Sequence, residues 1–377
     1  MKSILVLGAG KIGIVIADML AGSGDYAVTL ADNNPLVLQK LKKGVQLPAN
    51  YKTQALDVTD ANALEGALTG KYAVISALPY ALTLPVGRAA KACGAHYFDL
   101  TEDVTCTRAI KELAQGAEQA FLPQCGLAPG FVSIVAHALA QRFDRLDKVQ
   151  MRVGALPKYP SNALKYNLTW STEGLINEYC RPCEAIVGGQ PTEVMPLEQL
   201  EHFSLDGLEY EAFNTSGGLG TLCETLQGQV NELNYRSVRY PGHRDIAKML
   251  LQDLKLSQRQ DLLKEIFETA LPGTDQDVVL IFVTVSGHRE GRYLQETYAN
   301  KVFSRAVSGF WLSGNYLSAI QVTTASSVCA SLDLLRTGVL PQKGFVKQEQ
   351  IALEDFLANR FGAYYQASSP SAGEEVA

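Results

Sequence analysis

The stretch ILVLGAGKIG, residues 4–13, decides the fold of the first part of the chain. The apolar run 4–7 ends at glycines, as a buried parallel strand does, and apolar residues then recur at helical spacing over 12–20. A G-x-G-x-x-G motif between a strand and a helix binds dinucleotides, because its glycines allow a tight turn and a close approach of pyrophosphate to the backbone. We therefore predict that the phosphates meet a helix N-terminus. The residues expected to cradle them are Gly8, Ala9, Gly10, Lys11, Ile12 and Gly13.

Asp32 stands where this motif expects an acidic residue. It closes the second predicted strand, 19 positions after Gly13, near the usual spacing of about 20. A carboxylate there accepts hydrogen bonds from the ribose hydroxyls of NAD and repels the 2′-phosphate of NADP. Asn33, Asn34 and Pro35 add no cation. The sequence therefore predicts NAD in preference to NADP, bound by Asp32 and Asn33. The alternative is that Asp32 only caps the next helix.

Further turns are expected at the same edge of the sheet. Asp57 and Val58 end the third predicted strand and are candidate neighbours of the adenine, with a helix cap by Asp57 as an equal alternative. The reacting end of such a cofactor lies beyond the carboxyl ends of the strands, at the switch point of the sheet. The cofactor-binding residues expected there are Ala77, Leu78 and Pro79.

The acidic segment HYFDLTED, residues 96–103, reaches this edge as well. Asp99 and Glu102 are its acidic groups best placed for acid–base chemistry, and we predict Asp99 as a catalytic residue. Capping of the following helix by Thr101, Glu102 or Asp103 is the alternative. Tyr80 follows the nicotinamide segment and is a candidate substrate contact.

Hydrophobic periodicity predicts two kinds of architecture. Six short apolar strands alternate with helices up to residue 125, which is typical of a doubly wound parallel sheet in an α/β Rossmann domain. After GLAPGF, residues 126–131, the pattern predicts an α+β domain with a mainly antiparallel sheet. The expected strands there are 149–155, 166–171, 209–213, 234–239, 278–287 and 293–302, and expected helices along the chain include 110–119, 132–143, 174–179, 246–271 and 319–335.

We predict four segments on this basis. The Rossmann domain spans 1–125, and the α+β substrate and oligomerisation domain spans 126–318. C-terminal helices at 319–365 return to the Rossmann domain, and the small polar tail at 366–377 is disordered.

Composition excludes several classes of function. The formal net charge of −6 argues against a nucleic-acid partner and against an anionic membrane surface. No apolar run reaches the roughly 20 residues of a membrane-spanning helix, and the first residues lack the long apolar core and cleavage site of a secretory signal. The odd number of cysteines, seven, scattered through a large chain, favours reduced thiols in the cytoplasm. Cys180 and Cys183 form a lone C-x-x-C without a second ligand pair, so no metal site is expected.

Eight segments spread along the chain carry a family resemblance. They are SALPY (76–80), YFDLTED (97–103), CGLAPGF (125–131), GALPKYP (154–160), YNLTWS (166–171), EYCRP (178–182), LEYEAFNTSGGLGTLCET (208–225) and VRYPGH (238–243). In this order they resemble the saccharopine dehydrogenase family, and within it the L-lysine 6-dehydrogenases most closely. The resemblance implies an NAD(P)-dependent oxidoreductase acting on a carbon–nitrogen bond of a lysine-derived substrate. It also implies a homo-oligomer, with a dimer as the first expectation.

One departure from the family bears on the substrate. The resemblance implies that the glutamate-forming saccharopine dehydrogenases carry an Arg-Asp pair after the aromatic strand, and that this Arg binds a substrate carboxylate. This chain has Asn214-Thr215-Ser216-Gly217 at that place. Saccharopine carries three carboxylates, so a missing cation favours a smaller substrate such as lysine. The resemblance agrees with Asp32, since the lysine dehydrogenases use NAD and the glutamate-forming enzymes NADP.

Candidate substrate residues can be named from their surroundings. Arg181 and Arg239 stand in apolar or aromatic settings and could bind the substrate carboxylate or an internal acid. Tyr166 and Trp170 are expected to face one side of a strand, as pocket wall or as core. His243 follows Pro241-Gly242 at an expected helix start, where a neutral imidazole is favoured, and it is a second candidate base. The alternative for His243 is a helix cap or a surface site.

The sequence therefore predicts a lysine 6-dehydrogenase that converts the side-chain amine to a semialdehyde with release of ammonia and NADH. A saccharopine dehydrogenase or a related imine reductase is the alternative within the enzyme class. A non-catalytic NAD-binding sensor is the alternative from another class, because a fold by itself does not establish function.

Overall fold

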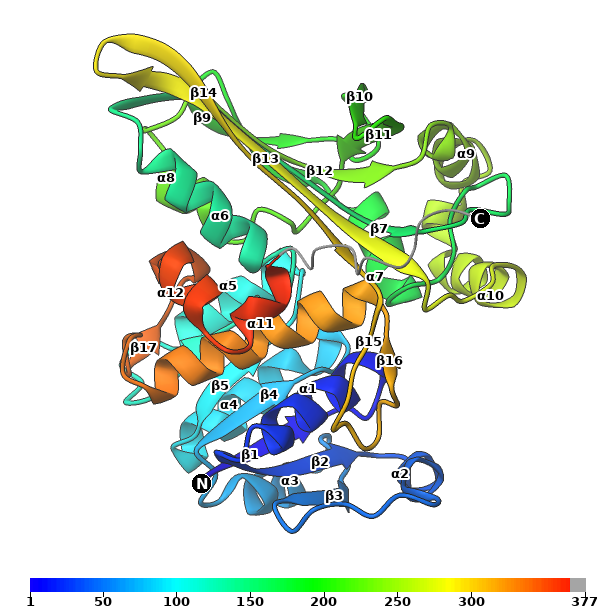
Figure 1. The fold of residues 1–377 in the computed structure, drawn as a ribbon, viewed down its shortest axis with the longest axis vertical. Coiled ribbons are helices and arrows are strands. Elements are labelled where there is room, and N and C mark those ends of the chain that lie inside the picture. Colours follow the sequence, from blue (N-terminus) through cyan, green and yellow to red (C-terminus); the bar gives the residue numbers. More distant parts are fainter. Residues whose placement is uncertain (367–377) are drawn as a thin grey trace.

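The computed structural model describes residues 1–366 and contains two large β-sheets, one above the other in Figure 1, with helices between and around them. The first sheet has seven parallel strands in the order β17-β6-β5-β4-β1-β2-β3. They are β1 (Lys2–Leu7), β2 (Tyr26–Asp32), β3 (Tyr51–Ala55), β4 (Ala73–Ser76), β5 (His96–Asp99), β6 (Ala120–Leu122) and β17 (Gly344–Phe345). The direction of the strand order reverses between β1 and β4, which confirms the predicted doubly wound Rossmann sheet.

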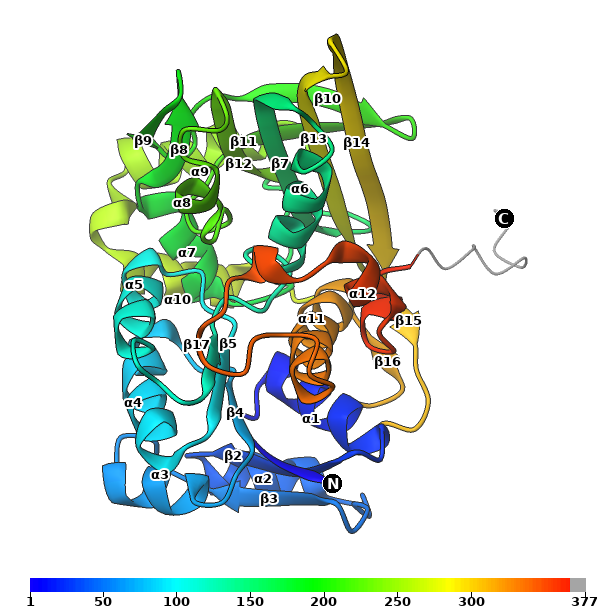
Figure 2. The same ribbon diagram turned by 90° about the vertical axis from the view of Figure 1, so that its left-hand side faces the viewer.

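Strand β1 shows why this sheet is apolar on both faces. Ile4 and Val6 belong to the core on one side, and Leu5 and Leu7 belong to the core on the other. Successive side chains of a strand point to opposite faces, so a sheet covered on both faces requires a continuous apolar run. One face is covered by α3 (Ala61–Leu68), α4 (Thr83–Cys93) and α5 (Val104–Leu113), and the other by α1 (Lys11–Gly22) and α11 (Ala319–Arg336) (Figure 2). The short α2 (Pro35–Lys42) connects β2 and β3.

The second sheet is mixed and mainly antiparallel, as predicted. Its main path is β10-β11-β12-β7-β13-β14, with β8 and β9 paired beside β12, and only β12 and β7 are parallel. Its strands are β7 (Arg145–Pro157), β8 (Cys183–Val187), β9 (Gln190–Val194), β10 (Glu201–Leu205), β11 (Leu208–Asn214), β12 (Glu232–Arg239), β13 (Asp277–Arg289) and β14 (Arg292–Phe303). The accompanying elements are α6 (Phe131–Ala140), α7 (Thr172–Cys180), α8 (Leu222–Leu226), α9 (His243–Lys248), α10 (Gln260–Ala270), α12 (Leu353–Ala358) and the two-stranded β15 (Arg305–Ala306) and β16 (Tyr316–Leu317).

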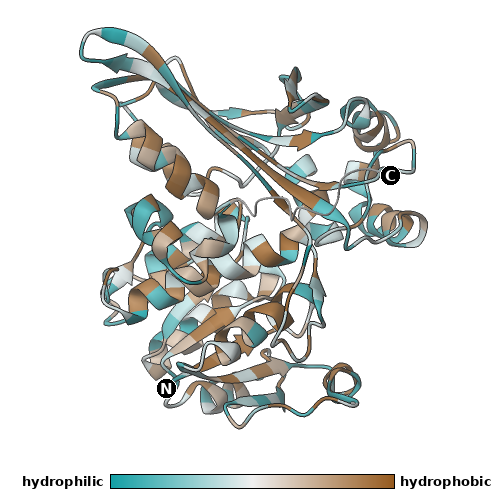
Figure 3. Cartoon of the chain, viewed as in Figure 1, coloured by the Kyte–Doolittle hydropathy of each residue, from teal (hydrophilic) through white to brown (hydrophobic). Residues whose placement is uncertain are grey.

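Helix α11 joins the two sheets. It packs against α1 on one side and against β13 on the other, and a single apolar cluster runs from β1 through α1, α11 and α6 to the inner face of the second sheet. Figure 3 shows hydrophobic residues concentrated along α6 and the strands of the first sheet. Asp277, at the start of β13, accepts hydrogen bonds from the N–H groups of Ala319 and Ile320 at the first turn of α11. Asp277 of the second sheet therefore caps the first turn of α11, the helix that lies over the first sheet.

The segment 166–171 is not the predicted strand. Only Leu168 forms a bridge, to Gly273, and its N–H donates to the carbonyl of Pro272. Tyr166 packs against the ring of His243, whereas Trp170 lines a cavity. The alternation of aromatic residues therefore reflects two different packing partners and not a pleated strand.

Two predicted helices are shifted or broken. The helix expected at 110–119 lies at 104–113, because the Asp103 side chain accepts a hydrogen bond from the N–H of Cys106 and starts the helix earlier. The helix expected at 246–271 is divided into α9, a π-helical turn at 249–253 and α10, since Lys255 adopts a left-handed conformation with φ of +56°. Strands β9 and β10 were not predicted, because polar residues predominate in their sequences.

Within residues 1–366, no helix combines the length and the apolar character needed to cross a membrane. The tail predicted to be disordered, 366–377, lies outside the described residues except for Gln366.

Candidate active site

A groove of about 370 Å³ runs along the carboxyl ends of β1 to β4; we call it the nucleotide groove. Among its lining residues are Gly8, Gly10, Asp32, Asn33, Asp57, Val58, Ala77, Leu78 and Pro79, all predicted to bind the cofactor. Lys11, Ile12 and Gly13 line the cavity that adjoins it, while Ala9 is buried between the two. The structure thus brings the predicted cofactor residues together at the switch point of the sheet, where ligands of such folds bind.

The three glycines of the loop have different surroundings. A Cβ on Gly13 would stand 1.9 Å from the carbonyl oxygen of Gly8, and Gly8 itself has φ of +97°. A Cβ on Gly10 would meet no atom within 4 Å, so this position faces open space. Helix α1 has no side chain capping its first turn, which leaves its N–H groups directed at that space. The loop therefore fits a dinucleotide phosphate, which needs free N–H donors and an unobstructed approach.

This geometry predicts opposite behaviour for two alanine variants. Gly13→Ala should destabilise the protein, because overpacking against backbone typically costs about 1–3 kcal/mol. Gly10→Ala should leave the melting temperature unchanged and yet weaken NADH binding, since its methyl group would fill the space meant for phosphate. Thermal unfolding and a fluorescence titration with NADH measure both. Unchanged NADH binding by Gly10→Ala would show that phosphate does not rest there.

Asp32 is held at the rim of the nucleotide groove. Its Oδ2 accepts a hydrogen bond from the N–H of Ala9 (2.8 Å), and its Oδ1 accepts one from the N–H of Asn34 (2.9 Å). Each carboxylate oxygen keeps a further lone pair for a ribose hydroxyl. The alternative role as helix cap belongs to Asn34, whose side chain accepts from the N–H groups of Leu36 and Val37.

Asp57 has a comparable local role. Its Oδ1 accepts hydrogen bonds from the N–H and the hydroxyl of Thr59, and these bonds lower the pKa of Asp57. The cap of α3 is Asp60, whose side chain accepts from the N–H of Ala63. Asp57 is therefore an ordered anion on the groove wall and not the cap of the next helix.

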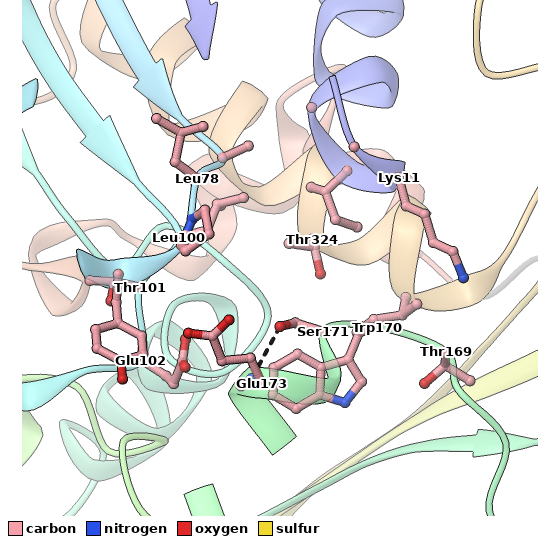
Figure 4. Close-up of a pocket in the computed structure, with 18 residues that line it drawn as sticks. Lys11, Leu78, Leu100, Thr101, Glu102, Thr169, Trp170, Ser171, Glu173 and Thr324 are labelled. Atoms are coloured by element: carbon pink, nitrogen blue, oxygen red, sulfur yellow. Dashed lines mark hydrogen bonds between the residues drawn. The ribbon is translucent and has the colours of Figure 1, made fainter. Parts of the chain in front are cut away.

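The nucleotide groove opens into a second cavity of about 380 Å³, which we call the cleft. It lies between the carboxyl edge of the first sheet and the segment 169–174 that leads into α7. Figure 4 shows Glu102 and Glu173 on one side of the cleft beside the ring of Trp170, with Lys11 on the other side. Tyr80, predicted as a substrate contact, also lines the cleft.

Glu102 is the acid whose surroundings suit proton transfer. Burial raises its pKa to about 7, and the negative charges of Asp103, Asp99 and Glu173 act in the same direction. The loop after β11 packs closely against the backbone of Glu102. A Cβ atom added to Gly217 in this loop would stand 2.4 Å from the carbonyl oxygen of Glu102. Residues far apart in the sequence thus set both the place and the proton affinity of this carboxyl group.

Behind Glu102 and Trp170 lies a smaller cavity of about 100 Å³, the inner chamber. It shares Leu100, Glu102, Trp170 and Thr324 with the cleft, so the two cavities adjoin. Its polar lining comes from Glu178 on α7 and from Tyr235, Ser237 and Arg239 on β12. Burial raises the pKa of Glu178 to about 8, with the charge of Glu102 adding to the shift and that of Arg239 opposing it.

Arg239 is held by a chain of hydrogen bonds. Its Nε donates to the hydroxyl of Tyr179 (2.9 Å), which lies 3.0 Å from Nε2 of His243. Nδ1 of His243 is 2.9 Å from the carbonyl oxygen of Leu164, and because a carbonyl only accepts, Nδ1 carries the proton and Nε2 accepts from Tyr179. Burial and the charge of Arg239 lower the pKa of His243 to about 3, so the imidazole is neutral. The ring of Tyr166 lies 5.3 Å from the guanidinium carbon.

Four predicted catalytic or substrate-binding residues line none of these cavities: Asp99, Tyr166, Arg181 and His243. Arg181 is exposed at the end of α7, where its Nε donates to Asn177, so its predicted burial near a carboxylate is not found. His243 is buried behind Tyr179 and lines neither the cleft nor the inner chamber. Asp99 is also buried outside both linings.

Asp99 is occupied by structural hydrogen bonds. Its carboxylate accepts from the hydroxyl of Tyr97 (2.7 Å) and from the N–H groups of Thr101 and Gln124. Burial raises its pKa to about 6 while these bonds lower it. Asp99 therefore fixes the loop that presents Glu102, and a direct contact with substrate would require these bonds to break.

Glu178 was missed by the sequence analysis. A usable signal was present, because Glu178 lies in α7 among the apolar residues Leu175, Ile176 and Tyr179, and a charged group is rarely buried without a partner. The C-x-x-C cysteines are free thiols, and within residues 1–366 no group of three or more His, Cys, Asp or Glu side chains is placed to hold a metal ion.

Family models account for both halves of the chain. The model described as the saccharopine dehydrogenase NADP binding domain matches residues 4–122, and the model described as the saccharopine dehydrogenase C-terminal domain matches residues 126–361. The apo saccharopine dehydrogenase (L-Glu forming) of Saccharomyces cerevisiae has a similar fold, with a TM-score of 0.76, 18% identity, and coverage of 94% of this chain and 96% of that chain.

Curated relatives are considerably longer than this chain. The mitochondrial alpha-aminoadipic semialdehyde synthase of Rattus norvegicus is 25% identical over 318 residues, which cover 72% of this chain and 33% of that protein. The saccharopine dehydrogenase (NADP+, L-glutamate-forming) of Saccharomyces cerevisiae is 29% identical over 184 residues, which cover 46% of this chain and 40% of that protein. The chain thus spans about a third to two fifths of the length of these relatives.

Proposed function

The chain belongs to the saccharopine dehydrogenase family, and on that premise we propose that it is an NAD-dependent dehydrogenase that oxidises the side-chain amine of L-lysine. One observation carries this proposal. The nucleotide groove, the cleft and the inner chamber adjoin one another, with an acid of raised pKa, Glu102, between the glycine loop and the buried cation Arg239. A substrate with an amine at one end and a carboxylate at the other matches this order of groups.

The residues divide the work as follows. Arg239 holds the substrate carboxylate through its guanidinium fork, and Trp170 forms the wall between chamber and cleft. Glu102 accepts a proton from the side-chain ammonium, because an amine without a free lone pair cannot stabilise the developing iminium. The bound nicotinamide supplies the hydride acceptor. Glu102 then orients the water that hydrolyses the substrate imine to semialdehyde and ammonia.

The lining of the nucleotide groove supports NAD over NADP. Its side chains include two aspartates, Asp32 and Asp57, and the part of the chain that the structure describes contributes no lysine or arginine to it. A 2′-phosphate would meet negative charge without a cation to neutralise it. We therefore propose NAD, although the matched relative from yeast is named for NADP+.

A saccharopine dehydrogenase is the second candidate, favoured by the names of the relatives. Saccharopine has three carboxylates, and among the described residues the cleft and the chamber together present only Lys11 and Arg239 as cations. A single buried guanidinium suits a substrate with one carboxylate better.

Purified protein tests both proposals in one assay. We expect NADH formation and ammonia release with L-lysine and NAD, and a slower rate with NADP. Turnover of saccharopine but not of lysine would replace the substrate. Cofactor binding without turnover of either would favour a sensor.

A further inference from the structure

Two buried ionisable groups of the inner chamber, Glu178 and Arg239, have no hydrogen-bonded partner of opposite charge among the described residues. Glu178 is 5% exposed and Arg239 is 3% exposed. No ion pair within 4.0 Å joins either side chain to a residue in the range 1–366. Arg239 uses Nε and one terminal nitrogen on Tyr179 and on the carbonyl of Val238. Its other terminal nitrogen donates to no described protein atom, and the Glu178 carboxyl group accepts no hydrogen bond from a described residue.

This arrangement is costly unless something polar enters the chamber. Burial of an unpaired ion is far less favourable than burial of a paired one, so buried charges are normally matched at hydrogen-bond distance. The chamber of about 100 Å³ equals the space of about three waters at roughly 30 Å³ each. It is thus large enough for the head group of an amino acid.

We propose that the inner chamber binds the zwitterionic α-amino-acid head of the substrate, with Arg239 on the α-carboxylate and Glu178 on the α-ammonium group. Each ionisable group, in its charged form, then gains an opposite charge at hydrogen-bond distance, which the protein itself does not provide. This inference rests on the proposed amino-acid substrate and adds Glu178 as the residue that distinguishes amino acids from simple amines and amino carboxylates.

The same placement sets which amine reacts. With the head in the chamber, the side chain extends past Trp170 and Glu102 toward the cleft, where the glycine loop lies. The α-amine is held away from the hydride acceptor, and only an amine at the far end of the chain reaches it. Chain length between the two amines therefore becomes a specificity element.

Binding measurements test this without relying on turnover. Calorimetric titrations of the NADH-loaded protein compare L-lysine, which has the complete head, with 6-aminohexanoate, which lacks the α-ammonium group. A hydrogen bond to a charged group contributes enough for about a 10- to 100-fold difference in Kd, so we expect wild-type protein to prefer L-lysine by that factor. In Glu178→Gln the two ligands should bind within about threefold of each other, the spread expected for a neutral contact.

Matched variants make the outcome decisive. Glu184→Gln, which alters a carboxylate paired with Arg108 at the surface, should keep the preference of the wild type. Glu178→Asp keeps the charge and should show an intermediate preference. A Glu178→Gln protein that binds NADH and still prefers L-lysine as strongly as wild type overturns the inference, and so does a wild type that does not distinguish the two ligands.

The two proposals can fail separately. Suppose that Glu178→Gln loses the preference for L-lysine but the wild type forms no NADH from lysine. This result would refute the proposed reaction and support the head-group site. If the wild type forms NADH from lysine and Glu178→Gln keeps the full preference for L-lysine, the proposed reaction is supported and the head-group site is refuted.

Discussion

Glu102→Gln is expected to abolish oxidation of the amine while NADH binding stays intact. The glutamine keeps the shape of the side chain but cannot accept the proton of the ammonium group. Loss of a general base typically lowers the rate about 10²- to 10⁴-fold. The measurement is steady-state NADH formation together with NADH titration, and Glu112→Gln, an exposed carboxylate on α5, serves as the control.

The pH dependence of the wild type follows from the same group. Burial holds the pKa of Glu102 at about 7, above its ordinary value of 4.5, and the negative charges of Asp103, Asp99 and Glu173 add to this shift. The ionised form is the base, so kcat/KM should rise with pH up to about 7 and then level off.

The contribution of Glu102 to the stability of the fold changes with pH in the opposite direction to the rate. The folded protein binds this proton more tightly than the unfolded chain, so the stability that Glu102 contributes falls as pH rises from about 4.5 to about 7. Glu102→Gln should therefore lose the rising limb of the rate profile and become more stable relative to wild type at pH 8 than at pH 4. If Glu102→Gln keeps wild-type rates, another group accepts the proton and the proposed role of Glu102 is refuted.

Arg239→Met is expected to weaken substrate binding strongly and to change kcat less. The variant removes the fork that binds the carboxylate and leaves the hydroxyl of Tyr179 and the carboxyl group of Glu178 without their cation. A charged hydrogen bond contributes about 1.5–3 kcal/mol, which corresponds to a rise in KM of about 10- to 150-fold. Because the chain of Tyr179 and His243 orients the guanidinium, His243→Gln should raise KM by a smaller factor.

Arg181→Met is the matched control, since Arg181 and Arg239 are equal candidates from the sequence. Arg181 is exposed and outside the cavities, so its replacement should leave KM unchanged. A larger effect on KM from Arg181 than from Arg239 would reject the assignment of the inner chamber. Arg239→Lys keeps the charge without the fork and should restore part of the affinity.

The nucleotide-binding half illustrates how far local sequence reaches. Strand β1, the glycine loop and α1 are consecutive, and each glycine has a steric role that the spacing already reveals. The antiparallel character of the second sheet was also predictable, because its strands follow one another with few helices between them. The strand expected at 166–171 was not found, since two aromatic residues spaced like a strand pack against different partners.

The candidate active site shows the opposite case. Sequence reasoning collected Asp99, Glu102, Arg181, Arg239 and His243 as possible acids, bases and cations, but its order of preference was not that of the structure. In particular, it chose Asp99 and His243 as the catalytic residues ahead of Glu102, whereas Glu102 is the one of these three that lines the cleft. Which group lines a cavity depends on the packing of segments more than a hundred residues apart, such as Glu102 against Gly217. Glu178 became a candidate site residue only when the structure showed its burial in α7.

The sequence by itself determined a family and a dinucleotide-binding sheet, because the glycine spacing, the acidic residue after β2 and the apolar strands act through neighbours along the chain. Only the tertiary structure decided that Glu102 lies in the cleft and that Glu178 and Arg239 share a chamber. Proton affinity and charge pairing depend on burial and on distances across the fold, and neither is written in the spacing of residues along one strand or helix.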